Sequence, residues 1–265
     1  MSKKTRSSSK NAAAERLGET RTMKCGEIAF IVEYTDSQNI TVQFKNSGEL
    51  VKTTYQHFKN GKVKSRFKPS VYGVGYLGYE KAVDENGKSL KSYVTWMHMI
   101  ERCYSDECQK TCPTYKDCYV CEEWHNYSNF KEWFDNNYYE IPNEKMALDK
   151  DILVKGNKIY SYETCVFVPQ NINTLFTKSN KVRGKYPIGV YFNKNAKKFM
   201  AYCSMLINGK KMKKYLGLYN TIEEAFNAYK QFKENYIKKV AEEYKDKIPQ
   251  KLYDAMYNYK VEITD

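Results

Sequence analysis

The fold of the carboxyl-terminal part of this chain can be predicted from residues 189–229, GVYFNKNAKKFMAYCSMLINGKKMKKYLGLYNTIEEAFNAY. Its alternation of apolar and polar side chains predicts three strands, over 189–193, 199–207 and 213–218. Asn208-Gly209, between the second and third strands, is typical of a two-residue hairpin turn. Thr221-Ile-Glu-Glu224 matches a capping box, and apolar residues follow it at helical spacing. We therefore expect a three-stranded sheet with a helix on one face.

Successive side chains of a strand point to opposite faces, so the same alternation sorts these residues into two sets. The first set is apolar and is expected under the helix: Val190, Phe192, Ala201, Cys203 and Leu216. The second set is polar, aromatic and cationic: Tyr191, Asn193, Tyr202, Ser204, Lys213 and Tyr215. Nothing else in this part of the sequence is predicted to cover the second set, so we expect it to face outward.

Positive charge is concentrated in the same part of the chain. The 265 residues contain 44 Lys and Arg against 31 Asp and Glu, a formal net charge of +13. Residues 178–218 contribute eleven basic side chains and no acidic one. Lysines expected on loops and strand ends are Lys185, Lys194, Lys197, Lys198, Lys210, Lys211 and Lys214. Such a field attracts a polyanion, most simply nucleic-acid phosphate, whereas a purely solubilising face would interleave acidic residues.

Residues 186–236 resemble the AP2 DNA-binding domain in the version found in phage and mobile-element proteins. The matching pieces are Gly189-Val190-Tyr191, Lys198-Phe199-Met200-Ala201-Tyr202, Tyr215-Leu216-Gly217-Leu218-Tyr219, and Thr221-Ile-Glu-Glu-Ala225 with Ala228-Tyr229. The resemblance implies that the outward set reads the major groove of double-stranded DNA. The arginines and tryptophans of the plant members are mostly absent here, so no target sequence carries over. We place this domain at 184–240, followed by a helix within 241–265 after Pro249.

The middle of the chain, 92–178, is expected to begin with helices over 92–104 and 126–136, whose aromatic residues recur at helical spacing. A strand, turn, strand, helix outline follows, from Ala147 to about residue 178. Leu148-Asp149-Lys150-Asp151-Ile152 and Phe167-Val168-Pro169-Gln170-Asn171-Ile172-Asn173 resemble the two halves of the HNH-type ββα domain of phage endonucleases. The resemblance implies a divalent cation, Mg²⁺ or Mn²⁺, held by Asp149 and Asn173, with Asn157 or Asn171 assisting, at the scissile phosphate.

Lys150 occupies the position where that family has its general-base histidine. A lysine with an ordinary pKa is protonated at neutral pH and accepts no proton from water. Either burial lowers the pKa of Lys150, or Asp151 acts as the base beside Asp149, or the site does not cut. The chain's three histidines, His57, His98 and His125, lie outside the ββα segment, and we interpret His98 and His125 as surface or packed residues.

Five of the eight cysteines lie at positions 103, 108, 112, 118 and 121. Cys118-Tyr-Val-Cys121 has the spacing of half a structural Zn²⁺ site, and Cys103 with Cys108 or Cys112 would supply the other half. The alternative is that these thiols simply fill apolar space.

The amino-terminal part predicts a basic flexible arm over 1–24 and a small antiparallel β domain over 25–80. Its expected strands are 27–34, 40–44 and 51–58. No apolar run is long enough to span a membrane and no signal-peptide pattern is present, so we expect a cytoplasmic protein with no membrane partner. The chain as a whole predicts an α+β, multidomain fold: N-terminal antiparallel β domain, central HNH-like ββα domain with flanking helices, and C-terminal AP2-like sheet and helix.

Three functions follow from these patterns. The first is a sequence-specific double-stranded DNA-binding protein of phage or mobile-element type, built on a degenerate HNH scaffold. The second is an active metal-dependent homing or nicking endonuclease. The third is an interaction protein that binds a host factor through its 25 Tyr and 12 Phe.

Overall fold

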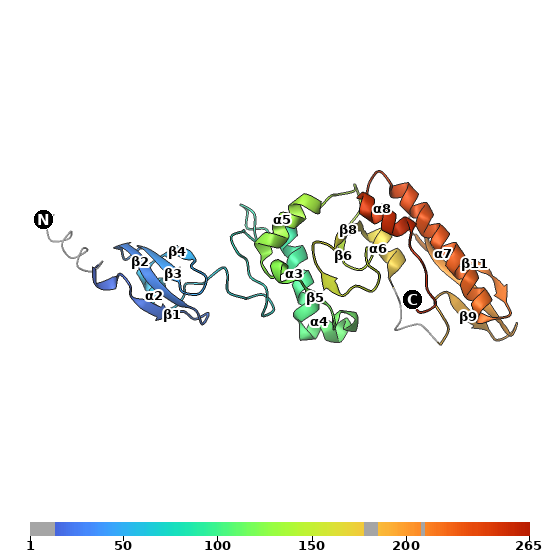
Figure 1. The fold of residues 1–265 in the computed structure, drawn as a ribbon, viewed down its shortest axis with the longest axis horizontal. Coiled ribbons are helices and arrows are strands. Elements are labelled where there is room, and N and C mark those ends of the chain that lie inside the picture. The colour runs from blue at the N-terminus through green and yellow to red at the C-terminus, as the bar shows by residue number, and fades with distance from the viewer. Residues whose placement is uncertain (1–13, 178–184, 208–209) are drawn as a thin grey trace. The chain divides into compact units, whose positions relative to one another are not determined.

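The computed structural model describes residues 14–177, 185–207 and 210–265 (Figure 1). It is a mixed α+β protein, as the sequence predicted, with a four-stranded and a three-stranded antiparallel sheet and several helices. The chain divides into two compact units, residues 1–136 and residues 137–265. Of the helices in the described ranges, none is long and apolar enough to cross a lipid bilayer.

The first unit begins with a four-stranded antiparallel sheet in the order β1-β2-β3-β4. Its strands are β1 (Thr20–Thr22), β2 (Ile28–Asp36), β3 (Asn39–Phe44) and β4 (Leu50–Thr53). Alternate residues of the two central strands form a small core with Phe58 and Val63: Ala29, Ile31, Ile40, Val42 and Phe44. An antiparallel sheet is present here, as expected, and period-2 burial of one face builds its core.

Two expectations for this region were wrong in detail. The arm predicted over 1–24 ends earlier, because residues 20–22 pair with β2 as strand β1 and Met23 is buried in the core. The strand predicted over 51–58 stops at Thr53, because the Thr54 hydroxyl accepts a hydrogen bond from the His57 N–H and starts helix α2 (Tyr55–Lys59). This short helix directs the side chain of Phe58 into the core of the sheet.

After an irregular segment over 60–90, the rest of the first unit is mainly helical. Its elements are α3 (Lys91–Tyr104), α4 (Asp106–Thr111), η1 (Pro113–Tyr115), β5 (Tyr119–Val120), η2 (Glu122–His125) and α5 (Tyr127–Asn137). The two helices predicted over 92–104 and 126–136 are confirmed within one residue. They pack through aromatic rings, and the indole Nε1 of Trp96 donates a 2.6 Å hydrogen bond to the carbonyl of Trp124. Trp96 and Trp124 are therefore core residues.

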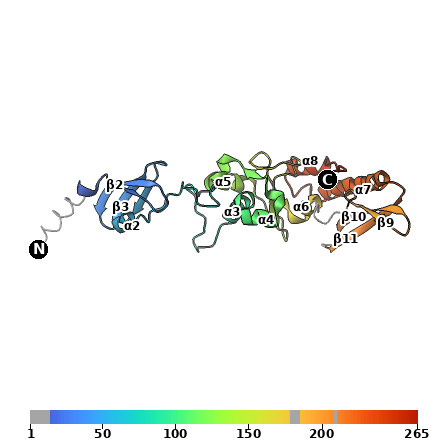
Figure 2. The ribbon, with the colours of Figure 1, turned by 90° about the horizontal axis from the view of Figure 1, so that it is seen from below.

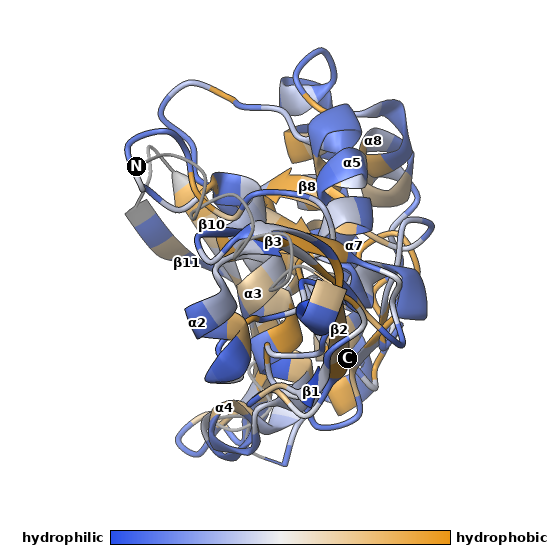
Figure 3. Ribbon diagram, turned by 90° about the vertical axis from the view of Figure 1, so that its left-hand side faces the viewer, coloured by the Kyte–Doolittle hydropathy of each residue, from blue (hydrophilic) through white to orange (hydrophobic). Residues whose placement is uncertain are grey.

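The second unit begins with the predicted ββα outline. Strands β6 (Met146–Asp149) and β8 (Val166–Pro169) pair antiparallel, with Asp149 opposite Val166 and Met146 opposite Pro169. The connection between them carries the short strand β7 (Ile159–Tyr160), and helix α6 (Gln170–Phe176) follows β8 directly. All four residues of β8, orange in Figure 3 where they are apolar, are buried. Asp149 thus lies at the end of β6 that is farther from the start of α6.

A three-stranded sheet in the order β11-β10-β9 follows. Its strands are β9 (Val190–Asn193), β10 (Lys198–Ile207) and β11 (Lys210–Tyr219). Ile207 pairs with Lys210, which confirms the hairpin, although its turn residues Asn208 and Gly209 lie outside the described residues. Helix α7 (Ile222–Tyr244) starts with the predicted capping box between Thr221 and Glu224 and lies along the sheet (Figure 2).

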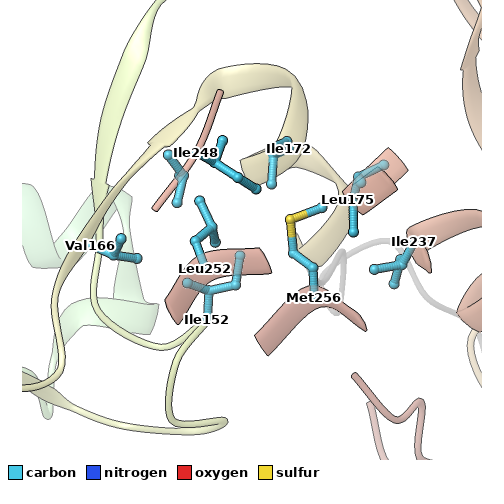
Figure 4. Packing of buried hydrophobic residues seen from close by; sticks show 10 residues of the cluster. Ile152, Val166, Ile172, Leu175, Ile237, Ile248, Leu252 and Met256 are labelled. Atoms are coloured by element: carbon cyan, nitrogen blue, oxygen red, sulfur yellow. The ribbon is translucent and has the colours of Figure 1, made fainter. Parts of the chain in front are cut away.

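Helix α7 extends beyond the sheet that it covers and contributes residues to a second core. Its first half covers the sheet through Ala225, Phe226 and Tyr229. Its second half runs past the domain boundary predicted at 240/241 and packs, with α8 (Gln250–Tyr257), on the ββα segment. Figure 4 shows side chains from α7 and α8 meeting side chains from the ββα segment in one core. The labelled members are Ile152, Val166, Ile172, Leu175, Ile237, Ile248, Leu252 and Met256. One helix therefore belongs to two cores, and the ββα segment and the sheet form a continuous structure.

Candidate nucleic-acid interface

The face of the three-stranded sheet opposite α7 carries the set of side chains predicted to point outward. Pairing places Tyr202 opposite Tyr215 and Ser204 opposite Lys213. Tyr191 and Tyr215 are each 47% exposed, while Tyr202 and Ser204 are half-buried by their neighbours on the same face. By contrast Val190, Ala201 and Cys203 are buried against α7. The predicted division of the two faces is confirmed for these residues, but Phe192, predicted to lie under the helix, is 39% exposed and outside that core.

Three tyrosines form a row across all three strands, which we call the tyrosine row: Tyr191, Tyr202 and Tyr215. The ring of Tyr202 lies 5.8 Å from that of Tyr191, in an edge-to-face arrangement, and 5.3 Å from that of Tyr215. The ammonium of Lys213 lies 5.6 Å from the centre of the Tyr191 ring, a cation–π distance. Mutual contact limits the rotamers of these side chains, so the row is partly organised before anything binds it.

A β-bulge keeps this row aligned. Ala201 is opposite Gly217, but the next residue of β10, Tyr202, is opposite Tyr215, so Leu216 has no partner strand residue. Leu216 packs instead against the core under α7. Gly217 has a φ of +137°, and a Cβ there would approach the ring of Tyr219. Without the extra residue, the register would turn Tyr215 to the covered face. The glycine at 217 is the only sequence signal of this bulge.

Asn193, one of the predicted base readers, is engaged locally. Its Oδ1 accepts hydrogen bonds from the backbone N–H groups of Asn195 and Ala196, at 3.0 and 3.1 Å. Its Nδ2 lies 3.5 Å from the sulfur of Met200. Asn193 therefore forms an Asx-type turn that joins β9 to β10. A side chain committed in this way offers no free amide to a ligand unless the turn opens.

The lysines around the face are exposed and have no acidic neighbours in sequence. Those with described side chains are Lys185, Lys194, Lys197, Lys198, Lys211, Lys213 and Lys214. In the described part of the chain, none of them makes an ion pair with a carboxylate. The side chain of Lys210 lies outside the described set. Because no described internal anion neutralises these charges, their field is directed to solvent.

Gly189 fixes how the sheet meets its helix. Its φ is +79°, and a Cβ built on it would lie 2.2 Å from the ring of Tyr229 on α7. Its carbonyl accepts a 2.8 Å hydrogen bond from the N–H of Tyr202, the central member of the tyrosine row. The glycine thus permits both a left-handed turn and the close approach of the helix.

One lysine of α7 lies on the covered side of the sheet. Burial, the largest cause, lowers the pKa of Lys233, and the nearby charge of Lys211 acts in the same direction. Lys233 and Tyr229 line a small open pocket of about 20 Å³ with residues of α6 and the carboxyl-terminal tail. The side chain of Lys233 therefore lies where the two cores joined by α7 meet.

The ββα segment was the second predicted site, and Asp149 lies at its centre. Its Oδ1 accepts hydrogen bonds from the N–H groups of Asp151 and Ile152, at 2.9 and 2.7 Å. Burial raises the pKa of Asp149 to about 6, with a further contribution from the charge of Asp151. The backbone hydrogen bonds and Lys150 oppose this shift without reversing it. Asp149 closes the turn that follows β6 and loses its charge in mildly acidic solution.

Lys150, in the position of the expected general base, is turned into the protein. It is 7% exposed, and its Nζ donates to the carbonyl of Asn157 at 2.9 Å and to Asp151 at 3.2 Å. Its ammonium also lies 5.8 Å from the centre of the Tyr160 ring. Lys150 thus links the start of the loop that follows β6 to Asn157 farther along that loop, and its ammonium donates to acceptors within the protein.

The three asparagines predicted near the metal have different environments. The Nδ2 of Asn157 donates to the carbonyls of Lys150 and Ile159, at 2.7 and 2.6 Å, so Asn157 is a loop brace. The Nδ2 of Asn171 donates to Glu144 at 3.2 Å. The side chain of Asn173, on α6, makes no hydrogen bond to another described residue. Among the described residues, Asn173 is therefore the predicted ligand whose side chain is least engaged by the protein.

The cysteines and histidines considered as metal ligands, Cys103, Cys108, Cys118, Cys121, His98 and His125, belong to the first unit. Cys103 and Cys118 are buried, and burial raises the pKa of the Cys121 thiol to about 11. His98 is exposed on α3, and His125 contacts Tyr104 at 3.2 Å. Within the ranges that the structure describes, no three His, Cys, Asp or Glu side chains converge as metal ligands do. The zinc and the divalent cation therefore stay predictions from the sequence.

Comparison of the chain with protein-family models, with curated proteins and with solved structures found no match. The AP2-like and HNH-like resemblances accordingly rest on the residues quoted above.

Proposed function

We propose that this protein binds double-stranded DNA through the outward face of the sheet β9–β11. The observation that carries the proposal is the face itself: the tyrosine row and Lys213 lie uncovered opposite α7, within a stretch of eleven basic and no acidic residues. A two- or three-stranded β-surface fits the major groove, where its side chains reach base edges. Exposed lysines at its rim bind phosphates and set the affinity and its salt dependence.

The ββα segment acts in this proposal as a brace for the binding sheet. Its core is completed by the second half of α7 and by α8, so the helix that supports the sheet is anchored at both ends. Lys150, Asn157 and Asp149 hold the loop after β6 through hydrogen bonds within the protein. That arrangement favours the degenerate scaffold over an endonuclease that uses Lys150 as its base.

The test is a duplex-binding titration of the full chain at several salt concentrations, from about 50 to about 200 mM. We expect tight binding that weakens steeply as salt rises. Replacement of Lys194, Lys197 and Lys198 by glutamine should reduce the slope of log K against log salt by roughly 0.9 for each phosphate that is no longer neutralised. A matched control replaces three exposed lysines of the first unit, Lys62, Lys64 and Lys88, and should leave the slope unchanged.

A second arm replaces Tyr202, Ser204 and Lys213 together by alanine. Undiminished retention of duplex by this variant would refute the proposed face. Adding Mg²⁺ or Mn²⁺ to the same mixtures and resolving the DNA on a denaturing gel tests the endonuclease alternative, since cleavage that disappears in Asp149→Ala would establish it. Weak DNA binding together with recovery of one stable protein partner would favour the interaction protein instead.

A further inference from the structure

The side chains available on the outward face limit which bases it can read. Residues 185–219 contain no Arg, Asp or Glu. Guanine is recognised by the donors of arginine or lysine, most often arginine, and the amino group of cytosine by a carboxylate. Arginine and carboxylates are absent from this sheet. Lys213, opposite Ser204 on the outward face, has its ammonium 5.6 Å from the centre of the Tyr191 ring.

The amide that would read adenine is also committed elsewhere. Recognition of adenine by asparagine uses the side-chain oxygen and nitrogen together. The Oδ1 of Asn193 already accepts two backbone N–H groups, and its Nδ2 faces the sulfur of Met200. Asn193 therefore reads a base only at the expense of the turn that it stabilises.

What the centre of the face does offer is apolar and aromatic surface. Met200 is paired with Tyr191 on one side and with Leu218 on the other, so the three lie side by side across the strands. Leu218 is 42% exposed. Next to them, the tyrosine row continues through Tyr202 and Tyr215. The lysines around this surface have no carboxylate partner among the described residues, and their charge favours a polyanion over an apolar protein partner.

In the major groove, the only apolar group on a base edge is the C5-methyl of thymine. We infer that this face selects DNA by packing Tyr191, Met200, Tyr202, Tyr215 and Leu218 against thymine methyl groups, so that its sites are rich in T·A pairs. The inference rests on the proposed duplex binding and adds the class of site to it. The lysines hold the backbone, and the methyl contacts distinguish one sequence from another.

The experiment removes the methyl group and nothing else. Duplexes that the full-length protein selects from a random pool are prepared again with deoxyuridine in place of thymidine, which keeps the base pairing and removes each C5-methyl. We expect selected sites to be rich in T·A pairs and binding to weaken about fourfold for each contacted methyl, the value of one buried CH₂ group. Substituting one position at a time then locates the contacts.

Variants assign the effect to the face. Tyr215→Ser and Tyr191→Ser should bind the thymidine duplex more weakly and lose most of the difference between thymidine and deoxyuridine. Tyr162→Ser removes a similarly exposed tyrosine (52% against 47%) from the ββα segment and should keep that difference. Thermal unfolding of each variant, run in parallel, verifies that it is folded.

The outcomes are separable. Equal affinity for the thymidine and deoxyuridine duplexes, with steep salt dependence retained, overturns the methyl reading and leaves the proposed duplex binding intact. If Tyr191→Ser and Tyr215→Ser still bind the thymidine duplex more tightly than the deoxyuridine duplex, the assignment of the methyl contacts to this face is overturned. Failure to bind any duplex overturns the proposed function itself, and the methyl reading with it.

Discussion

Two lysines of the second unit, Lys150 and Lys213, have opposite environments although both were predicted to be functional. Lys150 is buried in the loop after β6 and donates to a carbonyl and a carboxylate of the protein. Lys213 is exposed on β11, beside the ring of Tyr191 and without a carboxylate partner among the described residues. A buried charge with satisfied donors serves the fold, whereas an exposed charge without an internal partner is available to a ligand. The ammonium of Lys150 is thus directed to acceptors within the protein, and the side chain of Lys213 is accessible to a ligand.

The strongest test of this comparison uses two glycines with the same backbone angle. Gly189, beside the sheet, and Gly156, in the loop after β6, both have a φ of +79°. A Cβ on Gly189 meets Tyr229 at 2.2 Å, whereas a Cβ on Gly156 has no atom within 4 Å. Gly189→Ala should cost about 3 kcal/mol of unfolding free energy, and Gly156→Ala about 1 kcal/mol from backbone strain alone. Urea unfolding, with hydrogen exchange across 189–229, measures both.

Equal losses of unfolding free energy at the two glycines would mean that the close approach of α7 to Gly189 does not stabilise the protein. That result would contradict the proposal that the ββα segment and α7 brace the sheet. Gly189→Ala should also loosen the Tyr202 N–H, because that group donates to the carbonyl of Gly189. Its exchange rate is therefore a local readout that Gly156→Ala should not move.

Paired methionine substitutions of the two lysines sharpen the comparison directly. Lys150→Met leaves the carbonyl of Asn157 without its donor and should cost about 2 kcal/mol of stability, while duplex binding by the folded protein stays the same. Lys213→Met should change stability by no more than about 0.5 kcal/mol and weaken duplex binding at least severalfold. Thermal unfolding and a binding titration of both variants test this pair. Reversed roles, with Lys150→Met stable and impaired in binding or cleavage, would restore the catalytic interpretation of Lys150.

The smallest expected effect concerns a third lysine, Lys233, which lies between these two extremes. Burial lowers its pKa, so in alkaline solution, between the folded and the unfolded pKa, the folded state binds fewer protons than the unfolded state. Its contribution to stability therefore improves as pH rises from the lowered folded pKa toward the unfolded value near 10.4. Lys233→Met should be more stable than the parent chain near pH 7, and this advantage should shrink by about pH 9.5. Melting temperatures of both proteins at the two pH values check the sign, and an advantage that grows with pH would contradict it.

Local pattern was enough for much of the fold. Alternation placed Tyr191, Tyr202 and Tyr215 on one face, and Thr221 and Glu224 marked the start of α7, because these signals act between residues close together in the chain. The same local reasoning failed at Tyr55–Lys59, where the Thr54 cap ends a strand whose composition would have continued it. The bulge at Leu216 was missed because it depends on the partner strand.

Residue order alone was enough to predict the α+β class, the main strands and helices of the second unit, the tyrosine face of its sheet and the concentration of charge in 178–218. Contacts between distant segments were needed to show that α7 joins two cores, that Lys150 donates inward, and that Asn193 is committed to its own turn. The physical reason is that periodicity fixes the face a side chain occupies. Which partner satisfies a buried charge or an amide depends on atoms brought together from distant parts of the chain.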